Sequence, residues 1–461
     1  MIENLKPYPE YKDSGLPWLR EVPAHWEIAR SKRLFKQRKD FAQPDDQQLS
    51  ATQAYGVIPQ ALYEKRTGYR VVKISMHLDK RKHVEADDFV ISMRSFQGGL
   101  ERAWASGAIR SSYVVLKPIA DVVPGYFQYL FKSHQYINAL RATSDFIRDG
   151  QDLNFGNFCG VDLPIIPLQE QAAIARFLAW ATNRLDRAIG AKRRIIALLQ
   201  EQKQAIIHRA VTRGLDPSVP LKDSGIPWLG EIPEHWEVRR AKYLFREVDR
   251  RSETGAETHL AMSQRLGLVP SSMVQSTLRS QSYAGGKLCS SGDLVLNRLK
   301  AHLGVFAIAK QDGVISPDYT VLREQALAHA DYYACILKSP GCRGELQTRA
   351  KGIVEGFWRL YTGDFYEIRL PTPPIDEQLQ IMDLASQQTR DQDAAISRLE
   401  SEITLLREYR TRLVADVVTG KLDVREVAAG LPEEIQSDDV QDATEEDLDL
   451  DAEDEVPENL A

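Results

Sequence analysis

Several kinds of functional segment are missing from this chain of 461 residues. No apolar run approaches the roughly 20 residues that a membrane-spanning helix needs, and residues 1–15 have no apolar core typical of a secretory signal. The four cysteines show neither the CxxC spacing of a metal site nor a dense disulfide framework. These absences argue against membrane and disulfide-rich secreted proteins, and they favour a reducing, cytoplasmic location.

The motifs of several enzyme classes are also missing. The sequence has no GxxxxGK[ST] phosphate loop, which an ATP-driven translocase would need. It has no HExxH zinc motif, no GxSxG nucleophile elbow, and no N-P-P-Y/F or D-P-P-Y tetrapeptide of the adenine methyltransferases. A Pro-Asp pair within 316–324 lacks a following E-x-K at a nuclease-like distance. We therefore predict that this chain alone has no catalytic activity and binds no metal or cofactor.

Charge is distributed unevenly along the chain. Residues 426–461 hold fifteen Asp and Glu and no Lys or Arg, which leaves 50 acidic and 59 basic residues, a net charge of +9, in the rest. A positive body suits phosphate binding, because neutralised phosphates release condensed counterions. The acidic tail should be disordered. It is either a solubilising tail or an intramolecular DNA mimic that covers a basic groove.

The chain contains a long internal repeat. KDSGLPWLREVPAHWE (12–27) recurs as KDSGIPWLGEIPEHWE (222–237), and LPIIPLQEQ (163–171) is echoed by LPTPPIDEQ (370–378). AVTRGLD, ending at Asp216, matches VVTGKLD, ending at Asp423. Three matches in one order at nearly one offset indicate a whole domain and its connector in two copies.

Each repeat combines two kinds of structure. Short β-branched runs broken by Gly, Ser and Asp predict strands of an α+β or mixed α/β domain, for example within 88–93 and 293–299. Apolar steps of three, four and seven over 169–211 and 376–418, without internal proline, then predict a long helix with a coiled-coil seam. Two such helices most simply pack together, although a pair of independent oligomerisation helices is the alternative.

These patterns divide the chain into seven segments. They are an N-terminal Trp/Pro-rich segment (1–26), a first α+β domain (27–167), a long helix (168–213), the repeated Trp/Pro-rich segment (214–236), a second α+β domain (237–373), a second long helix (374–424) and the acidic tail (425–461).

The paired K-D-S-G-x-P-W-L and P-x-H-W-E segments, the P-[L/I]-x-E-Q helix openings and the two -LD endings resemble specificity subunits of Type I restriction-modification systems. The resemblance covers residues 8–425. It implies two target recognition domains, each contacting half of a bipartite double-stranded DNA site, and an antiparallel helical spacer. It also implies two modification (methyltransferase) subunits and two restriction subunits as partners, which would bring S-adenosylmethionine, ATP and Mg.

Physical considerations agree with this resemblance. Two domains on a rigid spacer would fix the separation of two half-sites, and because the two central blocks differ in sequence, the DNA site should be asymmetric. The alternatives are an enzyme that acts alone, a stand-alone DNA-binding regulator and a protein scaffold. Apolar residues on the first helix occupy more than one narrow stripe, which favours docked partners; they are Ile174, Phe177, Ile195, Ile196, Leu198 and Leu199.

Base contact in the major groove favours Arg, Lys, Asn, Gln and similar polar side chains on exposed loops. Loops after predicted strands supply Arg94, Gln97, Arg102, Asn297, Arg298, Lys300 and His302, and two later segments add Arg148, Gln151, Asn154, Arg359 and Tyr361. Each of them taken singly has a solvated surface role as its alternative. Beside them, Gly98 and Gly99 would permit close approach of the backbone to a phosphate.

The duplicated tryptophans Trp18, Trp26, Trp228 and Trp236 could stack on bases, but their Pro-rich context favours packing that pins each domain to the helices. His25 and His235 share that context, and we interpret them as structural. Glu170 and Glu377 fall in first helical turns, where a carboxylate complements the helix dipole, so we expect caps rather than general bases.

Overall fold

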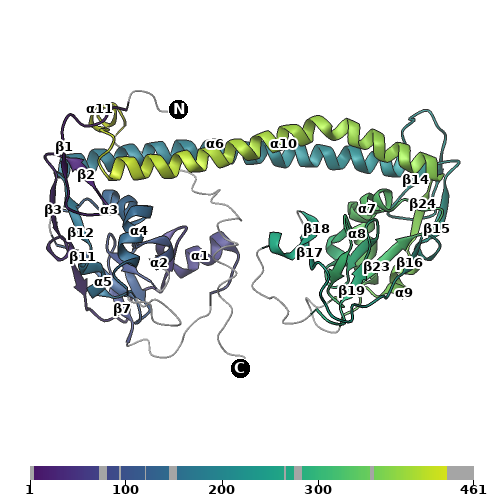
Figure 1. Cartoon of the computed structure of the whole chain (residues 1–461), viewed down its shortest axis with the longest axis horizontal. Helices are drawn as coiled ribbons and strands as arrows, with labels where there is room; N and C mark the ends of the chain where they lie inside the picture. The colour runs from purple at the N-terminus through teal and green to yellow at the C-terminus, as the bar shows by residue number, and fades with distance from the viewer. Residues whose placement is uncertain are drawn as a thin grey trace. The chain divides into compact units, whose positions relative to one another are not determined.

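The computed structural model describes residues 5–71, 80–92, 95–119, 121–144, 153–263, 266–274, 283–352 and 358–432. It divides into two compact units: unit 1 comprises Met1–Arg193 with Glu400–Ala461, and unit 2 comprises Arg194–Leu399. Each unit therefore combines one α+β domain with parts of both long helices (Figure 1).

The α+β domain of unit 1 contains a four-stranded antiparallel sheet in the order β4-β11-β8-β9. The strands are β1 (Tyr11–Asp13), β2 (Glu21–Pro23), β3 (Glu27–Arg30), β4 (Phe35–Arg38), β5 (Leu49–Thr52), β6 (Gly56–Pro59), β7 (Lys82–Val84), β8 (Phe89–Ile91), β9 (Glu101–Arg102), β10 (Gly107–Ile109), β11 (Val114–Pro118) and β12 (Asp162–Ile165). The helices are η1 (Ser31–Arg33), α1 (Gln60–Thr67), α2 (Ser95–Gly98), α3 (Pro124–Phe131), α4 (His134–Arg141) and α5 (Phe155–Cys159). Phe35, Phe89 and Phe131 pack edge-to-face or tilted in its fully buried core.

Unit 2 repeats this plan with the sheet β16-β23-β20-β21. Its strands are β13 (Leu221–Asp223), β14 (Glu231–Pro233), β15 (Glu237–Arg240), β16 (Phe245–Glu247), β17 (Leu260–Ser263), β18 (Gly267–Pro270), β19 (Lys287–Cys289), β20 (Leu294–Asn297), β21 (Phe306–Ile308), β22 (Gly313–Ile315), β23 (Tyr319–Glu324) and β24 (Arg369–Thr372). Its helices are η3 (Ala241–Tyr243), η4 (Ser271–Met273), η5 (Ala301–Leu303), α7 (Ala330–Lys338), α8 (Pro340–Arg349) and α9 (Thr362–Tyr366). The predicted α+β fold with an internal repeat is thus confirmed.

The long helices α6 (Leu168–Arg213) and α10 (Ile375–Val418) lie antiparallel within each unit (Figure 1). In unit 1, Asp186 and Lys192 of α6 form ion pairs with Arg410 and Glu402 of α10. In unit 2, Lys203 pairs with Asp393, and Val211 shares a buried cluster with Ile381. Residue numbers therefore fall along α10 as they rise along α6, which confirms that the helices pack together and contradicts independent helices. Neither these nor any other helix in the described ranges is long and apolar enough to cross a membrane.

A buried carboxylate joins the Trp/Pro-rich segment of unit 1 to the start of α6. Glu170 is 4% exposed, and it accepts hydrogen bonds from Tyr8 Oη (2.6 Å), Trp26 Nε1 (2.9 Å) and His25 Nε2 (2.8 Å). Burial, reinforced by the adjacent carboxylate, raises the pKa of Tyr8 well above its ordinary value, so the hydroxyl stays a donor. Glu170 is therefore a buried acceptor for three donors that lie far away in the sequence.

Unit 2 contains the same joint in a more open form. Glu377 accepts from Trp236 Nε1 (3.0 Å) and His235 Nε2 (2.8 Å), and its side chain is 22% exposed. Trp26 and Trp236 are fully buried, while Trp18 packs edge-on against Tyr136. The packing interpretation of the tryptophans is thus confirmed for the two that the joints enclose, and base stacking by these two is contradicted.

The glutamine after each of these glutamates fixes the loop that enters the helix. The buried Gln171 amide donates to the carbonyls of Ile166 and Asp121 and accepts from Val123 N. Gln378 repeats this with the carbonyls of Pro373 and Leu327 and with His329 N. The duplicated Glu-Gln pair of the sequence is therefore a structural joint, in which both the oxygen and the nitrogen of each glutamine amide find partners.

The end of each long helix packs against the Trp/Pro-rich segment of the same unit. Gly420, at φ +79°, lies so close to Pro23 that an added Cβ would be 2.4 Å from its Cδ. Beyond it, Asp423 N donates a hydrogen bond to Lys6 O. The chain that follows α10 therefore contacts the N-terminal segment, although the two are far apart in the sequence. The predicted tail 425–461 begins with α11 (Arg425–Ala429), whose Ala428 is buried; residues from 433 onward lie outside the described residues.

Candidate nucleic-acid interface

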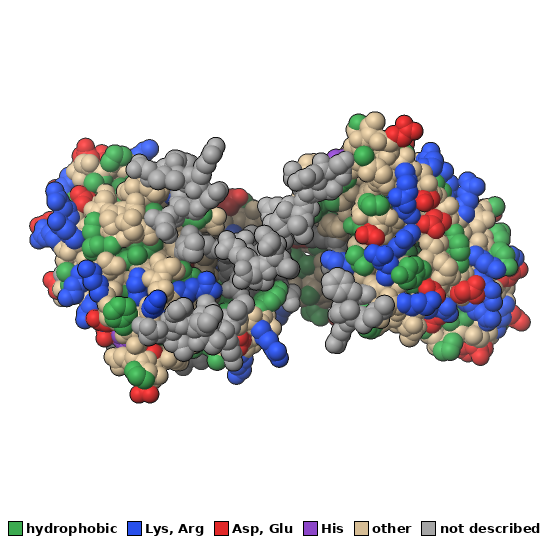
Figure 2. Space-filling model, turned by 90° about the horizontal axis from the view of Figure 1, so that it is seen from below, with side chains coloured by type: hydrophobic (Ala, Val, Ile, Leu, Met, Phe, Trp, Pro, Cys, Tyr) green, Lys and Arg blue, Asp and Glu red, His purple; other side chains and the backbone are tan. Residues whose placement is uncertain are grey.

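Most of the predicted DNA-contacting residues have a described position. Arg94, Arg148 and Gln151 lie outside the described residues, as does the side chain of His302, whose backbone is part of η5. Lys and Arg side chains, mixed with fewer acidic ones, spread over the faces of both units that Figure 2 shows.

In the first loop of unit 1, Gln97 and Arg102 differ in their freedom to contact DNA. Gln97 is exposed on the short helix α2. The Arg102 guanidinium donates to Asp87 Oδ1 (2.5 and 2.8 Å) and to Gln128 Oε1 (3.0 Å), and it lies over the ring of Trp104. The pairing orients Arg102 and neutralises its charge, so Gln97 is the freer of the two.

The glycines of this loop serve close packing within the protein. Gly99, at φ +80°, is placed so that an added Cβ would lie 2.0 Å from the carbonyl oxygen of Phe131, and one on Gly98 would meet the Gln53 amide at 2.6 Å. The backbone of this loop therefore packs closely against Phe131 of α3 and against Gln53, and the approach to a phosphate stays a prediction.

Asn154 has a local structural role. Its side chain accepts hydrogen bonds from Gly156 N and Asn157 N, while its own N–H donates to Asn157 Oδ1. This is a capping box at the start of α5, and it engages the acceptor oxygen that a base contact would use.

The second unit brings the two predicted segments together. Leu360 N donates to Arg298 O, which joins the loop after β20 to the segment before α9. Asn297 is buried and accepts from two following amides, and Arg298 bonds Thr320 Oγ1 (2.7 Å) and Glu247. Lys300 is exposed two residues after Arg298.

Arg359 and Tyr361 lie on either side of Leu360 in the sequence. Arg359 forms an ion pair with Asp318 (3.0 Å), while Tyr361 is 47% exposed. Among the described side chains of the predicted set in unit 2, Lys300 and Tyr361 are therefore exposed, whereas Asn297, Arg298 and Arg359 are engaged within the protein.

A basic hollow of about 370 Å³ lies elsewhere on unit 2, and it is lined by Ser224, Val238, Arg239, Arg240, Tyr243 and Arg369. Arg240 and Arg369 are direct partners in the antiparallel register and line it together with Arg239. In unit 1 the corresponding pair is Arg30 and Asp162. The two units therefore offer different charge patterns at equivalent places.

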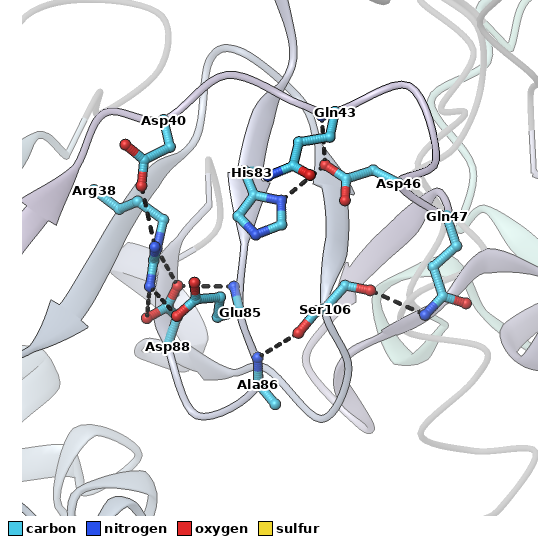
Figure 3. A network of polar contacts seen from close by, with 10 residues as sticks. All are labelled: Arg38, Asp40, Gln43, Asp46, Gln47, His83, Glu85, Ala86, Asp88 and Ser106. Atoms are coloured by element: carbon cyan, nitrogen blue, oxygen red, sulfur yellow. Dashed lines mark hydrogen bonds and ion pairs between the residues drawn. The ribbon is translucent and has the colours of Figure 1, made fainter.

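A buried ion-pair network holds the loop after β4 in unit 1. Figure 3 shows the Arg38 guanidinium among Asp40, Glu85 and Asp88, with Arg38 Nε 2.7 Å from Asp88 Oδ2. Arg38 and Asp88 are both almost fully buried. In unit 2, Asp293 occupies the place of Asp88 but pairs with Arg323 from β23. The carboxylate is kept in both repeats, whereas the strand that neutralises it changes.

No protein-family model matches the chain. It is 23% identical over 236 residues to the MjaX type I restriction enzyme specificity subunit of Methanocaldococcus jannaschii, which covers 47% of this chain and 52% of that protein. It is 34% identical over 85 residues to the MjaVIII specificity subunit of the same organism, 18% of each chain. The chain thus spans about half the length of the first relative and about a fifth of the second.

One solved structure shares the fold over most of the chain. A chain from work on complex assembly and conformational transition of the type I R-M system matches with a TM-score of 0.55 at 15% identity, over 87% of this chain and 99% of that one. The HsdS subunit of Thermoanaerobacter tengcongensis matches with a TM-score of 0.41 at 17% identity, over 87% and 98%. The chain resembles Type I specificity subunits. The resemblance drawn from the paired sequence motifs is thereby confirmed.

The structure also contains two groups of cations that the sequence patterns did not indicate. They are the hollow at Arg239, Arg240 and Arg369 and the strand ends at Arg81 and Arg110. A comparison of charges at matched positions of the two repeats would have found both groups. In each group, arginines stand where the other repeat has neutral or acidic residues. Among the described residues, no group of three or more His, Cys, Asp or Glu side chains could hold a metal ion.

Proposed function

We propose that this chain is the DNA-sequence-specificity subunit of a Type I restriction-modification complex. Each recognition domain contacts half of an asymmetric bipartite site in the major groove, and the helices set the spacing and dock modification subunits. Catalysis, with S-adenosylmethionine, ATP and Mg, then belongs to the modification and restriction subunits.

One observation carries this proposal: the same joint attaches two domains of one fold to the same pair of helices. The Trp–His–Glu contact is preserved in both units, yet the exposed loop residues differ, Gln97 in one and Lys300 in the other. Two domains that are attached in the same way but expose different side chains suit a protein that contacts two different stretches of one duplex.

The test is co-expression with the neighbouring modification subunit in a host without other adenine methylation, followed by sequencing for N6-methyladenine. We expect one asymmetric bipartite motif. If the isolated chain instead binds a single DNA sequence tightly and no methylation appears with the partner, the function is that of a stand-alone regulator and the proposal fails.

The exposed loop residues should control separate halves of that motif. We expect Gln97→Ala to relax one half-site and Lys300→Ala to relax the other, each weakening discrimination by roughly tenfold to a hundredfold, since a bidentate base contact contributes about 1–3 kcal/mol. The measurement is the methylated motif and its occupancy. Lys310→Ala removes another exposed lysine from unit 2 and should leave the motif unchanged; loss of both half-sites in one variant would contradict the assignment.

The long helix α6 carries an apolar surface that the other described residues leave exposed. Ile195 and Leu198 are 47% and 64% exposed, in contrast to Ile174 and Phe177, which are buried within unit 1. The broad apolar pattern of the sequence thus has two causes: part of it packs on the recognition domain, and part remains exposed. We assign the exposed part to a modification subunit.

Placing charges on this surface should block docking without unfolding the chain. We expect the double variant Ile195→Asp/Leu198→Asp to reduce co-purification with the modification subunit at least tenfold, because each buried aliphatic side chain contributes about 1.5–3 kcal/mol. The melting temperature should stay unchanged. Gln200→Asp/Gln204→Asp adds the same two charges at exposed positions of α6 and should co-purify normally; equal loss in both variants would point to charge alone.

A further inference from the structure

Two arginines lie opposite each other at one end of a strand pair in unit 1. Strands β7 and β10 are antiparallel and end at the partners Lys82 and Ile109, so Arg81 and Arg110 follow at the same end. Arg81 is only 9% exposed, whereas Arg110 is exposed. Burial, followed by repulsion from Arg110, lowers the pKa of Arg81. Like charges placed opposite on a strand pair destabilise it.

No carboxylate in the described ranges compensates these cations. Lys82 Nζ donates to the Tyr113 carbonyl, and none of the described Asp or Glu side chains pairs with Arg81, Lys82 or Arg110. The loop that runs beside β7 contributes Asp40 and Asp46, but these pair with Arg38 and His83 (Figure 3). Buried charges in proteins are ordinarily paired, so this group is an exception.

Unit 2 shows how the same place looks when it is neutralised. Lys287 occupies the position of Lys82, is 2% exposed, and pairs with Glu247 (3.1 Å) and Asp249 (3.5 Å). The corresponding residues of unit 1 are Gln37 and Lys39. Neither carries a negative charge, so neither can neutralise Lys82. The strand-end arginines have Gly286 and Ser316 as counterparts. At this site, unit 1 therefore has more cations and fewer anions than unit 2.

We infer that the ends of β7 and β10 bind a backbone phosphate of duplex DNA, held by Arg81, Lys82 and Arg110. Ser111 and Ser112, exposed in the turn after Arg110, add hydroxyl donors. A phosphate can accept from two guanidinium groups at once, which would convert their repulsion into binding energy. The inference rests on the proposed function and extends it: unit 1 has a phosphate clamp that unit 2 lacks.

The test uses variants that restore the pattern of the second repeat. Arg110→Ser copies Ser316, and Arg81→Met removes the buried charge while keeping most of the side-chain volume. We expect the double variant, in the full chain co-purified with its modification subunit, to bind a duplex with the methylated motif about tenfold more weakly. The slope of log K against log salt should fall by about 0.9 for one lost phosphate contact, and the methylated motif should not change.

Controls and contrary outcomes complete the test. The melting temperature should stay equal or rise, because repulsion is removed, and Arg33→Ser, which removes an exposed charge from η1, should leave affinity unchanged. Unchanged affinity and slope in the double variant would overturn the inference. So would a variant that changes DNA affinity only when residues 433–461 are present, since the site then binds the chain's own acidic tail. If the unaltered complex binds no DNA, the proposed function itself fails.

Discussion

Replacing Glu170 by alanine is expected to lower the free energy of unfolding of unit 1 by roughly 4 kcal/mol, because three buried donors lose their acceptor at once. Tyr8 Oη and Trp26 Nε1 both bond the same carboxylate oxygen, and His25 bonds the other. With Trp26 fully enclosed, water cannot easily replace the carboxylate. Hydrogen exchange of the amides in β1 and β2 measures the effect, since these strands hold the tryptophan segment in place.

The second repeat supplies the matched control. Glu377→Ala removes only two hydrogen bonds at a joint that is partly open to solvent, so we expect a loss of about 2 kcal/mol, confined to unit 2. Glu170→Gln keeps an acceptor oxygen and should fall between wild type and Glu170→Ala. Equal losses from Glu170→Ala and Glu377→Ala would show that the carboxylates act as helix-dipole caps alone.

The second large effect is expected at Arg38. Arg38→Met leaves the carboxylate of Asp88 buried without a cation and should cost about 3–5 kcal/mol at neutral pH. Burial already raises the pKa of Asp88, against the hydrogen bonds from Arg38, and losing Arg38 raises it further. The folded state then binds a proton more tightly than the unfolded state, so the penalty should grow as pH rises above about 4 and shrink as pH falls toward 4.

Chemical denaturation of the variant across that pH range checks the prediction. The double variant Arg38→Met/Asp88→Leu removes both charges and should recover most of the loss, since a buried pair can often be replaced by apolar residues. Arg323→Met in unit 2 should cost less, because the Arg323 side chain is 33% exposed and water can reach the vacated site. A pH-independent penalty in Arg38→Met would mean that packing, not charge, is what Arg38 contributes.

The repeat and the secondary structure could be predicted because they depend on local patterns. The run 293–299 forms β20 (Leu294–Asn297), and the apolar periodicity over 169–211 lies within α6 (Leu168–Arg213). Both follow from spacing and β-branched content within a single segment. The function of Glu170 could not be predicted in this way, because its partner Trp26 lies 144 residues earlier in the chain.

The candidate site was harder to predict for the same reason. Whether an arginine on a loop is free depends on which carboxylate the fold brings to it, and Arg102 and Arg359 turn out to be paired with Asp87 and Asp318. Asn154 is an instructive exception, since an Asn followed three residues later by another polar amide is itself a capping pattern. The individual base contacts remain predictions, and among the described members of the set Gln97, Lys300 and Tyr361 are exposed and not held by a neighbour within the protein.

The division of the chain into a discontinuous unit 1 and a continuous unit 2 has a consequence during synthesis. Leu413, Val417 and Val424 belong to the buried core around Trp26, yet they emerge from the ribosome after nearly all of the chain. Unit 2, contained within Arg194–Leu399, is complete earlier, so the usual order in which the N-terminal domain folds first is reversed. A nascent chain would keep its first recognition domain open to chaperones and proteases until α10 has been made.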